Sequence, residues 1–159
     1  MTSRFLEQLR GWLSAKTLSY FAPFWEAKKL HEGSPHGLFR RTFYDTLSDR
    51  DIQAARECPR LAKARELYCG CIERERKAGR VFNEGVACHQ LGLLLHRQGR
   101  LTEAARAYEK ALQILEDCPD ADALPPASTC HFRLAEIHIH NGNLDRASDH
   151  IEKGRRIDK

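Results

Sequence analysis

The stretch that decides the fold covers residues 86–112 and reads VACHQLGLLLHRQGRLTEAARAYEKAL. Leucines recur at helical spacing in its first half, which predicts an amphipathic helix over 86–97. Gly99 ends this helix, because glycine accepts the left-handed conformation that commonly follows a helix C-terminus. Thr102 then lies where the N-cap of another helix is expected. The stretch therefore predicts two helices joined by a tight turn.

The same pattern returns over residues 129–155, which read TCHFRLAEIHIHNGNLDRASDHIEKGR. When Gly142 is aligned with Gly99, Ala135 falls on Gly92 and Ile151 falls on Tyr108. Small residues at the first of these pairs let two helix backbones approach closely, and the larger residues fill the space one turn away. Asp145 corresponds to Thr102 as an N-cap residue. The chain thus contains a repeated helix–turn–helix unit.

A degenerate third unit is predicted over about residues 48–80. With Tyr68 aligned on Tyr108, residues 61–77 resemble the second helix of a unit, and its first helix is expected near residues 48–57. The segment 117–126 is expected to be an extra loop, because two consecutive prolines, Pro125 and Pro126, would break a helix there.

These features resemble the tetratricopeptide repeat, a helix–turn–helix unit of about 34 residues that stacks into a solenoid. The match is closest over residues 85–118 and weaker over 128–159, and the wider spacing of the units resembles kinesin light chain and polarity adaptors. The resemblance implies an all-α solenoid whose units bind a peptide or a helix of a partner protein in a concave groove.

The resemblance also implies which side chains line that groove, since the family takes them mostly from the first helix of each unit. They are Val86, His89, Leu93, His96 and Arg97 in the central unit, and Thr129, Phe132, Glu136, Ile139 and His140 in the last. His89 and Leu93 stand where the family's carboxylate clamp has lysine and asparagine, so capture of an acidic chaperone tail is not expected. The alternative is that His89 and His96 are exposed helix histidines outside any site. If they line the groove, binding is expected to change between pH 6 and 7.

The first 44 residues differ in composition from residues 45–159. They carry seven Lys/Arg against three Asp/Glu and nine of the thirteen aromatics, and they fall outside the repeat pattern. An amphipathic helix is predicted over residues 3–16, with a docking face of Phe5, Leu6, Leu9, Trp12 and Leu13. Three interpretations stay open: a cap on the first repeat, a membrane-surface or partner-docking helix, and a mitochondrial transit peptide. At the other end, the apolar edge beside Ile151 is expected to need a partner, a second copy or further sequence.

Other classes of protein are disfavoured by what the sequence lacks. It contains no run of 18 apolar residues, no phosphate-binding or nucleophile-elbow motif, and no paired cysteines at zinc-site spacing. Six cysteines without a secretory signal favour a reduced, intracellular setting. The balanced charge of residues 45–159 gives no reason to expect nucleic acid as a partner.

The sequence therefore predicts a non-catalytic adaptor or scaffold, without metal or cofactor, that binds another protein and works in the cytoplasm. One alternative is a mitochondrial or peripheral membrane protein that is targeted or anchored by residues 1–25. The other is an enzyme that uses cysteine and histidine chemistry. Self-association at the C-terminal edge also stays open.

Overall fold

The computed structural model describes residues 15–32 and 48–159, with side chains described from residue 23 onward in the first range. Within these ranges the chain is helical and has no strand, which confirms the predicted all-α class. The predicted docking face of residues 3–16 lies outside the described residues. The elements are α2 (Ala15–Glu32), α3 (Asp49–Glu57), α4 (Pro59–Lys77), α5 (Val81–Arg97), α6 (Leu101–Leu115), the short 3-10 helix η2 (Ala121–Ala123), α7 (Leu124–His140) and α8 (Leu144–Ile157).

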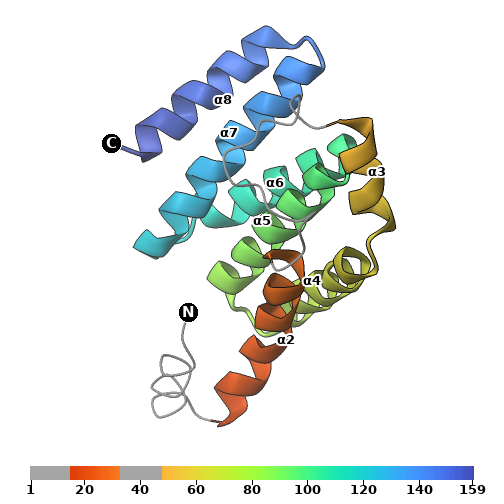
Figure 1. Cartoon of the computed structure of the whole chain (residues 1–159). Helices are drawn as coiled ribbons and strands as arrows, with labels where there is room; N and C mark the ends of the chain where they lie inside the picture. Colours follow the sequence, from red (N-terminus) through yellow and green to blue (C-terminus); the bar gives the residue numbers. More distant parts are fainter. Residues whose placement is uncertain (1–14, 33–47) are drawn as a thin grey trace.

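The helices pack as antiparallel pairs that follow one another through the molecule (Figure 1). The pairs are α2 with α4, α5 with α6, and α7 with α8. Helix α4 also packs on α5, and α6 on α7, so each pair rests on the next. This stacking is the predicted solenoid of helix–turn–helix units, and it leaves α5 and α6 in the middle of the molecule.

The turns between paired helices follow the predicted glycine geometry. Gly99 and Gly142 have φ values of 67° and 75°, and Gly79 between α4 and α5 has the same left-handed conformation with φ 67°. The predicted N-caps are wrong, however. Helix α6 follows Arg100 and α8 follows Asn143, and the side chain of neither residue caps its helix, so Thr102 and Asp145 lie inside the first turn.

Close approach of α5 and α6 depends on Gly92, as predicted. A Cβ atom at Gly92 would lie 2.5 Å from Cε1 of Tyr108, which is far inside van der Waals contact. Tyr108 is fully buried, as are Ala104 and Ala111 on the same helix. The small residue on one helix and the large one on the other therefore fit together as a matched pair.

Helix α4 takes a different partner from the one the sequence suggested. The expected first helix near residues 48–57 exists as α3, but α4 packs along α2 and barely contacts α3. Nδ1 of His31 on α2 lies 3.3 Å from Oη of Tyr68 on α4, with the rings edge to face. His96 and Tyr108 repeat this contact between α5 and α6, also at 3.3 Å and edge to face.

The repeated histidine–tyrosine contact places α2 in the first pair where α5 lies in the second. Ala27, one turn before His31, is fully buried, and it corresponds to Gly92, which lies one turn before His96. Residues 15–32 therefore take part in the stack of helix pairs, a role that the sequence analysis did not assign to them. In this pair the two helices, α2 and α4, are separated in the sequence by a long stretch and not by a short turn, so the regular spacing of the other pairs is absent. The boundary drawn at residue 44 stays a prediction.

Helix α3 docks on the C-terminal end of α5. It begins with a capping box between Ser48 and Asp51. Nε of Arg56 donates to the carbonyl of Gln98 at 2.7 Å, and Nε2 of Gln98 donates to the carbonyl of Ala55 at 3.1 Å. The last carbonyls of a helix have no partner within it, so these bonds attach α3 to the central pair, α5 and α6. We call α3 an insertion, because it lies in the sequence between the paired helices α2 and α4.

The loop within segment 117–126 is shorter than predicted. It includes η2, and Pro125 and Pro126 lie in the first turn of α7 instead of breaking a helix. The first turn tolerates proline because its backbone N–H groups have no acceptor within the helix.

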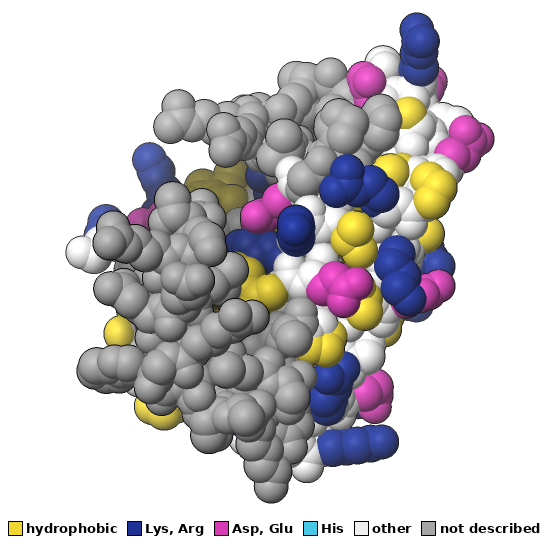
Figure 2. Space-filling model, turned by 60° about the horizontal axis from the view of Figure 1, so that its bottom comes forward, with side chains coloured by type: hydrophobic (Ala, Val, Ile, Leu, Met, Phe, Trp, Pro, Cys, Tyr) yellow, Lys and Arg dark blue, Asp and Glu magenta, His cyan; other side chains and the backbone are white. Residues whose placement is uncertain are grey.

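On the described surface visible in Figure 2, Lys/Arg and Asp/Glu side chains alternate with small apolar areas. Among the described residues, no helix is both long enough and apolar enough to span a bilayer.

Candidate functional site

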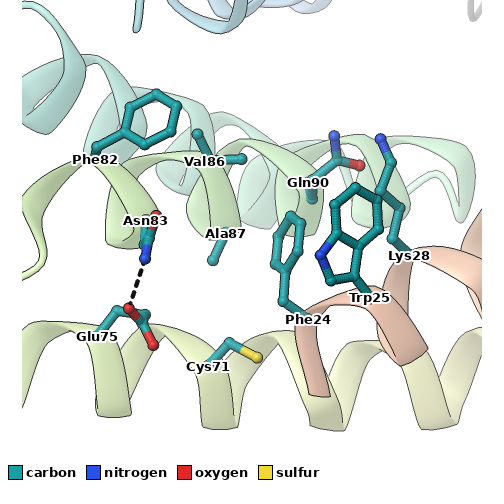
Figure 3. A pocket seen from close by; sticks show the side chains of 10 residues that line it. All are labelled: Phe24, Trp25, Lys28, Cys71, Glu75, Phe82, Asn83, Val86, Ala87 and Gln90. Carbon is teal, nitrogen blue, oxygen red and sulfur yellow. Dashed lines mark hydrogen bonds between the residues drawn. The ribbon is translucent and has the colours of Figure 1, made fainter. Parts of the chain in front are cut away.

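A pocket of about 260 Å³ opens between α2, α4 and α5. Figure 3 shows side chains from all three helices converging on it. Its lining is largely apolar, with polar groups at the two ends. The lining residues are Phe24, Trp25 and Lys28 from α2, Cys71 and Glu75 from α4, and Phe82, Asn83, Val86, Ala87 and Gln90 from α5.

Aromatic rings from α2 form one wall of this pocket. Phe24 stands edge to face against Trp25, with ring centroids 6.0 Å apart, and against Tyr68 at 5.9 Å. Tyr68 is fully buried, so Phe24 is held from behind by the core. Trp25 keeps 39% of its surface exposed at the mouth. An incoming group therefore meets an aromatic surface that is packed on the core.

The inner polar end is occupied by a tightly bonded carboxylate. Oε2 of Glu75 accepts from Nε of Arg80 at 2.6 Å and from Nδ2 of Asn83 at 3.0 Å, and Oε1 accepts from Nη2 of Arg80 at 3.1 Å. Burial raises the pKa of Glu75, but the hydrogen bonds from Arg80 and Asn83 and the charge of Arg80 lower it more, so the net shift is downward. Glu75 is therefore ionised and its acceptors are engaged, which suits a structural role.

Lys28 is the charged residue at the mouth of the pocket. Its Nζ lies 3.0 Å from Oε1 of Glu32 and 5.9 Å from the centroid of the Trp25 ring. The side chain of Lys28 is 28% exposed. It therefore presents positive charge beside the exposed indole, where a cation and an aromatic face attract each other.

The predicted groove residues of the central unit are mostly buried. Val86 lines the pocket and Leu93 is half-buried, while the exposed fractions of His89, His96 and Arg97 are 7%, 0% and 8%. The alternative that His89 and His96 are exposed helix histidines is therefore wrong. Among the described residues, neither ring nitrogen of His89 has a hydrogen-bond partner.

Burial also sets the protonation of these two histidines. Burial, and then the charges of Lys28, Arg133 and His31, lower the pKa of His89 to about 4. Burial, followed by the charges of Arg133 and His140, lowers the pKa of His96 to about 3. Both rings are neutral at pH 6–7, so the expected change of binding in that interval does not come from them.

The predicted groove residues of the last unit lie in different environments. Oγ1 of Thr129 donates to the carbonyl of Pro125 at 3.0 Å, and Glu136 is buried in an ion pair with Arg133 at 2.8 Å. Phe132 packs on α8, where a Cβ at Gly154 would lie 3.0 Å from its Cζ. Ile139 and His140 are exposed. The ten residues thus share no single exposed surface, and their role as a groove stays a prediction.

The pocket itself was missed by the sequence analysis. Its aromatic wall comes from a segment that matched no repeat, and its other walls come from α4 and α5, which pack on that segment only in the folded chain. The dense aromatic cluster over residues 20–25 was the signal that could have marked it.

Three histidines come together between α7 and α8. Nε2 of His131 lies 2.8 Å from Oε1 of Glu116, and Nδ1 of His131 lies 2.9 Å from Nδ1 of His150. Because a carboxylate only accepts, Glu116 holds a proton on Nε2 of His131, so Nδ1 of a neutral His131 accepts from His150. His138 stacks on His150 at 5.4 Å. Burial, followed by the charges of His131 and His138, lowers the pKa of His150 to about 4.

The buried cysteines are poorly suited to nucleophilic chemistry. Burial raises the pKa of the Cys71 thiol, raises that of Cys88 to about 11, and raises that of Cys130 further. Catalytic thiols have lowered pKa values instead. In the described ranges, no three His, Cys, Asp or Glu side chains form a group able to hold a metal ion.

Comparison with known proteins agrees with the helix pairs. A family model described as tetratricopeptide repeat matches residues 84–159, which include nearly all of α5 and the whole of α6, α7 and α8. No curated protein and no solved structure shows significant similarity to the chain. The matched range, the paired helices and the glycine turns agree with one another, so residues 84–159 form tetratricopeptide repeats, which are protein–protein interaction modules.

Proposed function

We propose that this protein is a non-catalytic adaptor that binds a peptide or a helix of a partner protein across the first helices of its pairs, α2, α5 and α7. The observation that carries the proposal is the open, largely apolar pocket between α2, α4 and α5, with Trp25 exposed at its mouth. A concave apolar pocket with a few polar groups is the usual form of a binding site.

A binding role is also supported by the chemistry of the pocket. Its carboxylate, Glu75, is engaged by Arg80 and Asn83, and the pKa of its thiol, Cys71, is raised by burial. Neither group is poised to transfer a proton or attack a substrate. The pocket offers apolar contact area in place of reactive groups.

We also propose that the protein works in the cytoplasm. The alternative, targeting or membrane attachment through residues 1–25, concerns a segment that lies largely outside the described residues. Fusion of residues 1–25 to a fluorescent protein tests it directly. A diffuse signal eliminates the alternative, and a mitochondrial or membrane signal replaces the cytoplasmic proposal.

The adaptor proposal is tested by affinity capture from cell extract with wild-type protein and two charge variants. Leu93→Glu combined with Ile139→Glu places charges on α5 and α7, where the partner is proposed to lie. Arg106→Glu changes an exposed residue of α6 and serves as the control. Circular dichroism melting first verifies that all three proteins fold.

The proposal expects a set of proteins retained by wild type and by Arg106→Glu and lost from the double variant. If the retained set is the same for a folded double variant, the partner does not bind across these helices.

A further inference from the structure

The size of the α2/α4/α5 pocket restricts what can enter it. A cavity of ~150 Å³ holds a benzene molecule, whereas drug-sized ligands occupy roughly 300–1,000 Å³. The pocket measures about 260 Å³, so it accommodates one aromatic side chain. This volume is smaller than the range that drug-sized ligands usually occupy.

The walls suit an aromatic ring in particular. Phe24, Trp25 and Phe82 contribute three rings to the lining, and Figure 3 shows them on both sides of the open space. Aromatic pairs in edge-to-face or offset-stacked geometry attract each other more than the burial of their apolar area alone would explain. Phe24 already makes two such contacts with its neighbours, so its ring orientation is set before any partner arrives.

The charges around the pocket favour an anionic neighbour of that ring. Among the described lining residues, the charged ones are Glu75 and Lys28. The acceptors of Glu75 are taken by Arg80 and Asn83, while Lys28 lies at the open mouth with Glu32 as its ion-pair partner. An ammonium group has three N–H donors, so Lys28 can bind a second carboxylate. Burial keeps the nearby His31 and His89 neutral, each with a pKa of about 4.

We propose that the pocket receives a phenylalanine or tryptophan side chain of a partner segment in which an acidic residue lies next to that ring, with the ring between Phe24, Trp25 and Phe82 and the carboxylate on Lys28. This inference rests on the proposed adaptor function and names the chemistry of its partner.

The probe is the blocked pentapeptide acetyl-Gly-Asp-Phe-Asp-Gly-amide, titrated into ¹⁵N-labelled full-length protein. Two matched peptides replace either the phenylalanine by alanine or both aspartates by asparagine. The first peptide is expected to shift the amide signals of residues 82–90 and the indole N–H of Trp25. The alanine peptide is expected to bind at least 10-fold more weakly, and the asparagine peptide several-fold more weakly at low salt.

Two pairs of variants locate the binding. Val86→Phe fills the pocket and is expected to weaken binding of the first peptide at least 10-fold. Val81→Phe places the same ring on α5 at a residue that is 51% exposed and outside the pocket lining, so it should bind normally. Lys28→Gln should remove the preference for aspartate over asparagine, and Lys29→Gln on the adjacent exposed residue should keep it.

The outcomes separate this inference from the adaptor proposal. Equal affinity for the phenylalanine and alanine peptides, or signal shifts away from residues 82–90 and Trp25, overturns the aromatic pocket. If Leu93→Glu with Ile139→Glu still loses its captured partners, the adaptor proposal survives that result. If the peptide binds in the pocket but the double variant retains every captured protein, the aromatic pocket is supported and binding across α5 and α7 is wrong. The Lys28→Gln variant changes a side chain that is only partly buried, so its result does not depend on whether the pocket-filling variant folds.

Discussion

At the scale of single residues, the approach of paired helices depends on which glycine faces a neighbour. Gly92 meets the ring of Tyr108 at a distance that leaves no space for a methyl group, whereas nothing lies within 4 Å of a Cβ built at Gly70 on α4. The two glycines lie inside helices, so the helix-propensity gain from alanine is the same for both. Only packing separates them.

Gly92→Ala is therefore expected to lower the free energy of unfolding by about 1–3 kcal/mol, because the new methyl group overpacks the contact with Tyr108. Gly70→Ala, the matched control, is expected to raise it by about 0.5–1 kcal/mol. Urea denaturation of both variants measures the two changes. A Gly92→Ala protein as stable as wild type would show that α5 and α6 can move apart enough to accommodate a methyl group at this contact.

The cysteines give a second prediction at this scale. Cys69 is exposed, while Cys71, Cys88 and Cys130 are buried with raised thiol pKa values. Iodoacetamide at pH 7.5 is expected to modify Cys69 first and to leave the three buried thiols unmodified until the protein unfolds. Peptide mass spectrometry over a time course reads the order. A buried thiol that reacts before Cys69 would revive the enzyme hypothesis.

At the scale of elements, the unusual feature is α3, which belongs to an insertion and not to a helix pair. Its attachment to the end of α5 runs through Arg56, which donates to the carbonyl oxygens of Gln98 and Gly99. Ile52 and Ala55 of α3 are also buried, so the hydrogen bonds of Arg56 add to the apolar packing that holds this helix.

Arg56→Ala is expected to release α3 locally, with a loss of roughly 1–2 kcal/mol in its protection against amide exchange. Hydrogen exchange should become faster over residues 49–57, while α5 to α8 keep their protection. Arg50→Ala, at an exposed residue of the same helix, is the control. Unchanged exchange in Arg56→Ala would mean that packing alone holds α3.

At the scale of the whole molecule, buried histidines couple stability to pH. The pKa values of His31, His89 and His150 are lowered to about 4 and that of His96 to about 3, from 6.5 in the unfolded chain, with burial as the leading cause in each. Between pH 6.5 and 4 the unfolded chain binds more protons than the folded one. The stability is therefore fully present above pH 6.5 and decreases as the pH falls toward 4.

The melting temperature is accordingly expected to fall steadily from pH 7 to pH 5. Protonation of His96, which is fully buried, lowers the free energy of unfolding by about 2 kcal/mol over this interval, a figure that follows from its pKa shift. His96→Gln should reduce the slope, and His140→Gln, an exposed neighbour, should change it little. The lowered pKa of Glu75 adds a loss only below its unfolded value of 4.5, so it does not affect this interval. A melting temperature that stays constant down to pH 5 would contradict the neutral burial of these rings.

The sequence by itself determined the helix pairs α5/α6 and α7/α8. Helical spacing, the turn glycines Gly99 and Gly142, and the small residue at Gly92 act between segments that adjoin along the chain. These signals are local, so each can be recognised within a single repeat without reference to the rest of the chain.

Only the tertiary structure decided the role of α2, the burial of His89 and His96, and the pocket. The partner of α4 lies across an insertion, so no regular spacing links Tyr68 to His31. A pocket is the space left between three packed helices, and its shape depends on how residues far apart in the chain meet. The same long-range packing determined which predicted groove residues became exposed, because burial is a property of neighbouring helices and not of position within a repeat.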